Sequence, residues 1–137
     1  MILDDVMTYL GSASVGLTAG TNLFAGTCPE SPDRSCAIYE TGGMQPIHAM
    51  SGSPGNALVE RPRISIITRA MTYQSARQLA QNIFQVMDGL TNTTINGTSY
   101  LLVRAVNSPS QMDVDKGRPR LVMNFDIIKK VSTSTST

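Results

Sequence analysis

Few side chains in this sequence of 137 residues could carry out catalysis or hold a metal. The only histidine is His48, so general-base catalysis or a Cys–His nucleophile would depend on this one imidazole. Two cysteines, Cys28 and Cys36, flank residues 29–35; with one histidine they fall short of the four ligands of a structural zinc site. We therefore expect no metal, no other cofactor, and two free thiols that are buried or half-exposed, and whether the thiols ever pair is left open.

The sequence also lacks the common catalytic motifs. It has no GxSxG, no phosphate-binding Walker loop, no HExxH and no CxxC. Residues 113–117, Asp-Val-Asp-Lys-Gly, begin like a calcium loop, but the remaining ligands of such a loop do not follow. The sequence therefore predicts a protein that is not an enzyme.

Charge is unevenly distributed, although the net charge is only +1. Residues 1–60 hold one base and six acids, 1 − 6 = −5, and residues 61–137 hold ten bases and four acids, 10 − 4 = +6. The basic half is consistent with a nucleic-acid surface, or with a basic face that meets the acidic face of another subunit. A third possibility is that folding intermingles the two halves.

Composition favours one domain. The hydrophobic fraction of 41% supports a modest core, and no apolar run reaches the roughly 18 residues of a membrane span. The acidic start, Met-Ile-Leu-Asp-Asp, is unlike a signal peptide, so we expect an intracellular protein. We expect a single domain over residues 1–131 and a disordered Ser/Thr tail over residues 132–137.

Apolar periodicity predicts the secondary structure. The strongest pattern starts after Thr72, a plausible N-cap, and runs as an amphipathic helix to Gly89. Residues 42–62 contain four glycines and three prolines with no apolar period, which predicts a long loop that orders against a neighbouring subunit. The other expected elements are a short helix over residues 3–13 and strands over residues 20–27, 36–41, 63–70, 99–106 and 120–131. The predicted fold is α+β: a mainly antiparallel sheet of three to five strands, with one long helix packed on one face and a short N-terminal helix.

Several short motifs resemble the tail terminator and minor capsid proteins of tailed bacteriophages. They are residues 62–80 (Pro-Arg-Ile-Ser-Ile-Ile-Thr-Arg-Ala-Met-Thr-Tyr-Gln-Ser-Ala-Arg-Gln-Leu-Ala), Thr-Asn-Leu-Phe at 21–24, Glu-Thr-Gly-Gly at 40–43, Tyr100, Asn-Ser-Pro at 107–109, Asp-Lys-Gly-Arg at 115–118 and Asn-Phe at 124–125. The resemblance implies a structural virion protein of the tail or neck, assembled in the host cytoplasm. It implies a ring of six copies that caps the tail tube, stops its growth and joins it to the head-side connector proteins.

Two other functions remain open at this point. One is a neck or connector stopper from the same virion region, and the other is a nucleic-acid-binding adaptor. Candidate residues for subunit or partner contacts are Arg61, Arg63, Arg69, Asp113, Asp115, Lys116 and Arg118. Arg104 and Arg120 are candidates to line the lumen of a ring, where genomic DNA would pass without specific binding.

Overall fold

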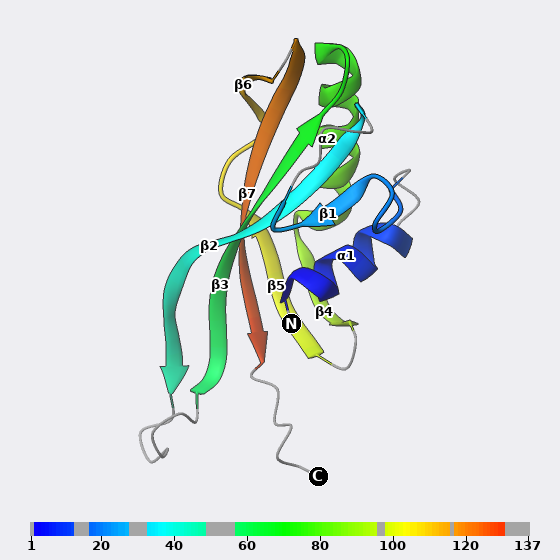
Figure 1. Cartoon of the computed structure of the whole chain (residues 1–137). Helices are drawn as coiled ribbons and strands as arrows, with labels where there is room; N and C mark the ends of the chain where they lie inside the picture. The colour runs from blue at the N-terminus through cyan, green and yellow to red at the C-terminus, as the bar shows by residue number, and fades with distance from the viewer. Residues whose placement is uncertain are drawn as a thin grey trace.

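The described part of the chain forms two helices and one seven-stranded sheet (Figure 1). A computed structural model describes residues 2–12, 17–27, 33–48, 57–95, 98–115 and 117–130. The elements in chain order are α1 (Ile2–Ser12), β1 (Leu23–Ala25), β2 (Ser35–His48), β3 (Ala57–Arg69), α2 (Tyr73–Met87), β4 (Leu90–Ile95), β5 (Thr98–Ala105), β6 (Ser110–Asp115) and β7 (Arg118–Lys130).

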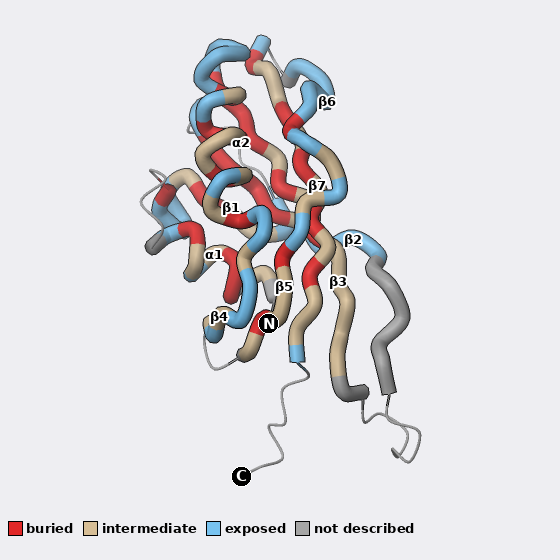
Figure 2. The backbone as a smooth tube through the Cα atoms, turned by 180° about the vertical axis from the view of Figure 1, so that it is seen from behind, coloured by how far each residue is buried: buried red, intermediate tan, exposed pale blue. Residues whose placement is uncertain are grey.

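The sheet has the strand order β1-β2-β3-β7-β5-β4, and β6 pairs with the first part of β7. The short β1 runs parallel to β2, and the other neighbouring strands are antiparallel. Both helices lie on the same side of the sheet, as the front and back views agree (Figures 1 and 2). The sheet curls so far that α1 contacts β1 and β2 near one edge and also β4 at the other.

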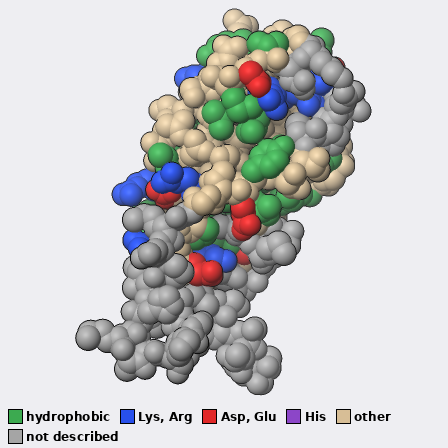
Figure 3. All heavy atoms as spheres, turned by 60° about the vertical axis from the view of Figure 1, so that its left-hand side comes forward, with side chains coloured by type: hydrophobic (Ala, Val, Ile, Leu, Met, Phe, Trp, Pro, Cys, Tyr) green, Lys and Arg blue, Asp and Glu red, His purple; other side chains and the backbone are tan. Residues whose placement is uncertain are grey.

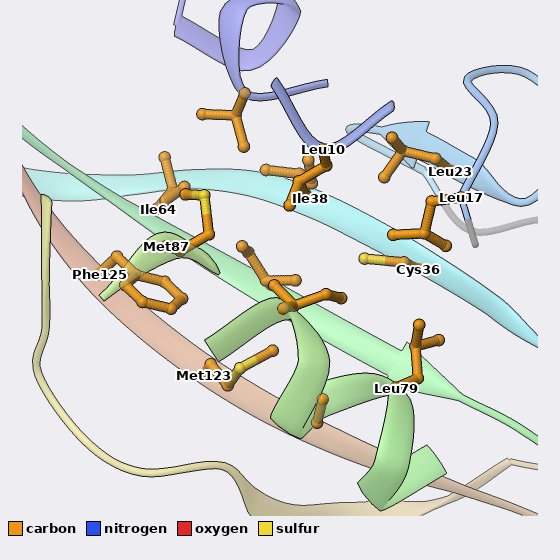
Figure 4. Close-up of a cluster of buried hydrophobic side chains, with 14 of the residues drawn as sticks. Leu10, Leu17, Leu23, Cys36, Ile38, Ile64, Leu79, Met87, Met123 and Phe125 are labelled. Carbon is orange, nitrogen blue, oxygen red and sulfur yellow. The ribbon is translucent and has the colours of Figure 1, made fainter. Parts of the chain in front are cut away.

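The core lies between α2 and the two long central strands. From Leu121 to Ile127 of β7 every second side chain is buried, because successive residues of a strand point to opposite faces. The helix contributes Leu79, Ile83 and Met87, and Figure 4 shows Leu79 and Met87 among side chains from both helices and four strands. Phe84 adds a tilted aromatic contact with Phe125, at 6.4 Å between ring centroids.

Both predicted ends of the second helix are confirmed. The Thr72 hydroxyl accepts a hydrogen bond from the backbone N–H of Ser75 at 3.2 Å, which satisfies one of the unpaired donors at the helix start. After the helix, Gly89 adopts a φ of +82°, a left-handed conformation that is strained for residues with a Cβ. The chain thereby turns from α2 directly into β4.

Two tyrosine hydroxyls fasten α1 to the rest of the chain. Tyr9 donates a 3.1 Å hydrogen bond to the carbonyl oxygen of Val86. Tyr100 on β5 donates a hydrogen bond to the Asp5 carboxylate, and both side chains are buried. Burial is the main cause that raises the pKa of Tyr100, and the hydrogen bond to Asp5 raises it further. A polar pair inside the apolar core therefore holds the N-terminal helix across the opening of the sheet.

The predicted fold class is wrong. Strands dominate the structure: the sheet has seven of them rather than three to five, it curls around the core, and both helices are short. Strand β4, Leu-Thr-Asn-Thr-Thr-Ile, has only two apolar residues at its ends, and β6 exposes Met112 and Val114. Neither strand has the alternating pattern on which the prediction relied.

The predicted loop over residues 42–62 is mostly strand. Residues 42–48 continue β2 and residues 57–62 belong to β3, so the two form a long hairpin that extends from the body (Figure 1). The register shifts between Thr41 and Met44, and again before Ile47, where glycines and a proline interrupt regular pairing. Residues 49–56 and the predicted tail, 132–137, lie outside the described residues. In the described part of the chain, no helix is long and apolar enough to cross a membrane.

Candidate assembly surface

The face of the sheet opposite the helices carries the outward-facing residues of β3, β7 and β5. In register across these strands, Arg63 lies opposite Asp126, and Asp126 lies opposite Arg104. Ile67 lies opposite Val122 on the same face, and both are half-buried. Figure 3, which brings the left-hand side of Figure 1 forward, shows small groups of charged side chains separated by apolar and uncharged ones. This mixture is common on surfaces that bind other proteins.

A two-pronged ion pair lies in the centre of that face. The Arg63 guanidinium donates from Nε to Asp126 Oδ1 at 2.6 Å and from Nη2 to Oδ2 at 3.3 Å. The hydrogen bond and charge of Asp126 raise the pKa of Arg63. Arg104 on β5 also lies opposite Asp126, and its side chain is exposed. Of these three residues, Arg104 is therefore the most accessible to a partner.

A second such pair joins β6 to β7. Arg120 donates to Asp113 from Nε at 2.6 Å and from Nη2 at 2.5 Å. The hydrogen bonds from Arg120 lower the pKa of Asp113, which stays ionised at neutral pH. Asp113 was predicted to lie at an interface and Arg120 to line a lumen, and the structure brings the two residues together on one hairpin.

Two other predicted interface arginines are buried within the chain. Arg69 is 2% exposed and donates from Nε to the backbone carbonyl of Asp33 at 3.3 Å. Arg118 is 6% exposed and donates from Nη1 to the Asp33 carboxylate at 3.1 Å. These contacts attach the segment before β2 to the ends of β3 and β7. Both arginines thus have a structural role inside the subunit.

The remaining candidates lie in less defined places. Arg61 is half-buried on the β3 side of the long hairpin, opposite Met44, and Asp115 ends β6 opposite Arg118. Lys116 and Cys28 lie outside the described residues, and Cys36 is fully buried in the core. His48 ends β2, and among the described residues no group of His, Cys, Asp or Glu could hold a metal ion.

Ion pairing also settles how the acidic and basic halves of the sequence combine. Arg118 joins Asp33 at 3.1 Å, and Lys129 joins Glu60 at 3.7 Å, so two ion pairs link the halves. The pairs at Asp126 and Asp113 lie within the basic half. Among the described residues, the folded chain thus compensates internally part of the asymmetry that its sequence suggests.

Exposed apolar side chains form a feature that the sequence analysis missed. Met71 and Tyr73, in the turn from β3 to α2, are 63% and 44% exposed, and Val114 on β6 is 55% exposed. Both elements lie at the end of the molecule farthest from the long hairpin (Figure 1). Exposed apolar residues gathered at one end are typical of a protein-binding surface. These surfaces are consistent with a subunit that binds other proteins.

Comparison with known proteins identifies the family. The pattern of the bacteriophage tail terminator proteins matches residues 9–131. The fold is similar to a chain in the virion of a native gene transfer agent particle, with a TM-score of 0.62 and 16% identity over 95% of both chains. A second solved structure, known only by a sequence identifier, gives a TM-score of 0.50 at 12% identity, covering 92% of this chain and 89% of the other. No curated protein matches the sequence.

This chain belongs to the bacteriophage tail terminator family. Its role is therefore structural: it is a tail terminator, a component of the virion tail that contacts other tail or head proteins. The resemblance in the sequence motifs is confirmed. The family is one of structural virion proteins, in line with a function in assembly rather than catalysis.

Proposed function

We propose that six copies of this chain close into a ring that caps the last ring of the tail tube. The cap stops tube growth and offers its other side to the head-side connector proteins. The match to tail terminator proteins over residues 9–131 is the observation that carries this proposal. Assembly takes place in the host cytoplasm, before the tail joins the head.

The two ends of the subunit support a cap that binds different partners on its two sides. One end carries the long hairpin of β2 and β3, and the other carries exposed Met71, Tyr73 and Val114. A ring built from heterologous contacts keeps all copies in the same orientation, so its two sides differ. One side can then bind the tube while the other binds the connector.

Charge pairing favours a lumen through which DNA passes without specific binding. Arg63 and Arg120 already hold carboxylates within the subunit, and these carboxylates offset their positive charge. Nucleic-acid affinity depends on cations that are available to neutralise phosphates. Arg104 and Arg120 remain the candidates for the lumen wall, with Arg104 the more accessible.

The candidate contacts between subunits are on the two hairpins. Arg61 and Arg63 belong to the β2–β3 hairpin, and Asp113 and Asp115 belong to β6; Lys116 follows Asp115 in the sequence and lies outside the described residues. Arg69 and Arg118 support these hairpins from inside the subunit. The β2–β3 hairpin extends beyond the helix-covered core (Figure 1), and Asp113 on β6 is exposed, which supports a role for both hairpins in contacts with a neighbouring copy.

Shortening the long hairpin tests the proposal. We expect deletion of residues 44–60 to leave a folded subunit, because the core residues of β3 begin at Ile64, but to weaken ring formation. Native mass spectrometry gives the number of copies, and circular dichroism checks the fold. A wild-type chain that remains monomeric at all concentrations would contradict the ring, and a deletion variant that assembles normally would contradict the role of the hairpin.

A further inference from the structure

Two strands of the sheet have an outer edge with no partner in the described residues. Strand β1 pairs with β2 only at Cys36, Ala37 and Ile38, so the edge of β2 is uncovered from Glu40 onward. At the other end of the strand order, β4 pairs with β5 on one side only. An unpaired edge presents a row of N–H and C=O groups that another strand can bind.

These two edges match in length, although the register of β2 shifts between Thr41 and Met44 and Asn92 within β4 has a φ of +47°. Residues 40–45 of β2 precede Pro46, which lacks an N–H, and so provide six residues for pairing. Strand β4 is also six residues long, contains no charged residue and no proline, and is rich in threonine. Natural edge strands that must stay unpaired usually carry charges or prolines. Strand β4 lacks both, and Thr91 and Thr94 on it are exposed.

The positions and directions of the edges fit a ring. Four antiparallel steps connect β2 through β3, β7 and β5 to β4, so β2 and β4 point the same way. Figure 1 shows the far half of β2 and the strand β4 on opposite sides of the same half of the molecule. Rotation about a ring axis preserves the component of each strand's direction along that axis, so strands that run along the axis can meet those of the next copy in a parallel pair.

We propose that residues 40–45 of β2 in one copy pair in parallel with Leu90–Ile95 of β4 in the next copy, continuing the sheet around the ring. This inference rests on the proposed ring and names the contact that builds it. The joint is heterologous, since it joins two different edges, and it therefore propagates instead of closing a two-fold dimer. The backbone supplies the hydrogen bonds, as in other cases of strand addition between chains.

Charged substitutions on both strands of the proposed β2–β4 pair test this contact. Thr41 on β2 and Thr91 and Thr94 on β4 are exposed and uncharged. One pair of variants carries like charges, with all three positions replaced by Glu or all three by Lys. The matched pair carries opposite charges, Thr41→Glu with Thr91→Lys and Thr94→Lys, and the reverse. Substitution at Thr41 removes its 3.2 Å hydrogen bond to the Arg63 carbonyl in all four variants alike.

Like charges directly opposite each other on paired strands are destabilising, and opposite charges are stabilising. We expect the like-charge variants to need on the order of tenfold more protein for half-assembly than the opposite-charge variants, measured by sedimentation velocity. Circular dichroism and melting of the dilute subunits check that all four variants fold. Within one copy the two edges lie at opposite ends of the strand order, where salt screens their interaction.

Assembly at equal concentrations for like-charge and opposite-charge variants, with an intact wild-type ring, would overturn the edge-to-edge contact and leave the ring itself standing. A wild-type chain that forms no ring would instead contradict the proposed function. The two failures are therefore distinguishable in one set of measurements.

Discussion

Removing the hydroxyl of Tyr100 is expected to loosen the N-terminal helix from the sheet. In Tyr100→Phe the ring still fills its place in the core, but Asp5 loses the hydrogen bond donated by the tyrosine. A buried hydrogen bond to a charged group contributes about 1.5–3 kcal/mol to stability. For a chain of this size that loss corresponds to a decrease in melting temperature of roughly 5–12 °C.

Tyr9→Phe provides a matched control. It removes one hydroxyl from the same helix-to-body contact, but its acceptor is the neutral carbonyl of Val86, so the expected loss is about 0.5–1.5 kcal/mol. Urea unfolding of dilute protein, where assembly does not add stability, measures both variants. If Tyr100→Phe destabilised the chain no more than Tyr9→Phe, the buried pair would not be what holds α1.

Three other predictions concern the core and the titrating groups. Leu79→Ala should destabilise the chain by about 2–5 kcal/mol, because Leu79 is fully buried, whereas the exposed neighbour Gln78→Ala should change stability little; urea unfolding compares them. An NMR titration should place the pKa of Asp113 below the ordinary aspartate value, and Arg120→Ala should return this pKa to the ordinary value. Because the pKa of Asp113 is lowered in the folded state, the contribution of the Asp113–Arg120 pair to stability should be lost as the pH falls through that pKa. The pKa of Tyr100 is raised above the ordinary value of about 10, so its contribution should be lost as pH rises beyond that value, and unfolding at high pH should show a steeper loss in wild type than in Tyr100→Phe.

Sequence patterns predicted the elements that bury a regular apolar face. The alternation of Leu121, Met123 and Phe125 located β7, and Thr72 and Gly89 located the ends of α2, because these signals are local. Strands β4 and β6 were missed since their pairing partners, rather than their own apolar residues, make them strands. Tertiary pairing thus overrode weak local preference, and the number of strands was underestimated.

The candidate interface was likewise predicted only in part from the sequence. The sequence indicated which arginines could bind carboxylates. Only the fold reveals that Arg69 and Arg118 bind Asp33 within the same subunit. The exposed apolar end was missed because Met71 and Val114 occur in segments that read as turn and link. A sequence pattern indicates which residues are apolar, whereas their exposure depends on the packing of distant elements.

The central claim is that this tail terminator limits tube growth by capping the tube with a ring. Electron microscopy of tail tubes assembled from purified tube protein, with and without this chain, tests it most directly. We expect that adding the chain yields shorter tubes that stop growing and carry a six-membered ring at one end. Tubes that continue to lengthen equally in its presence, with no ring at either end, would contradict it.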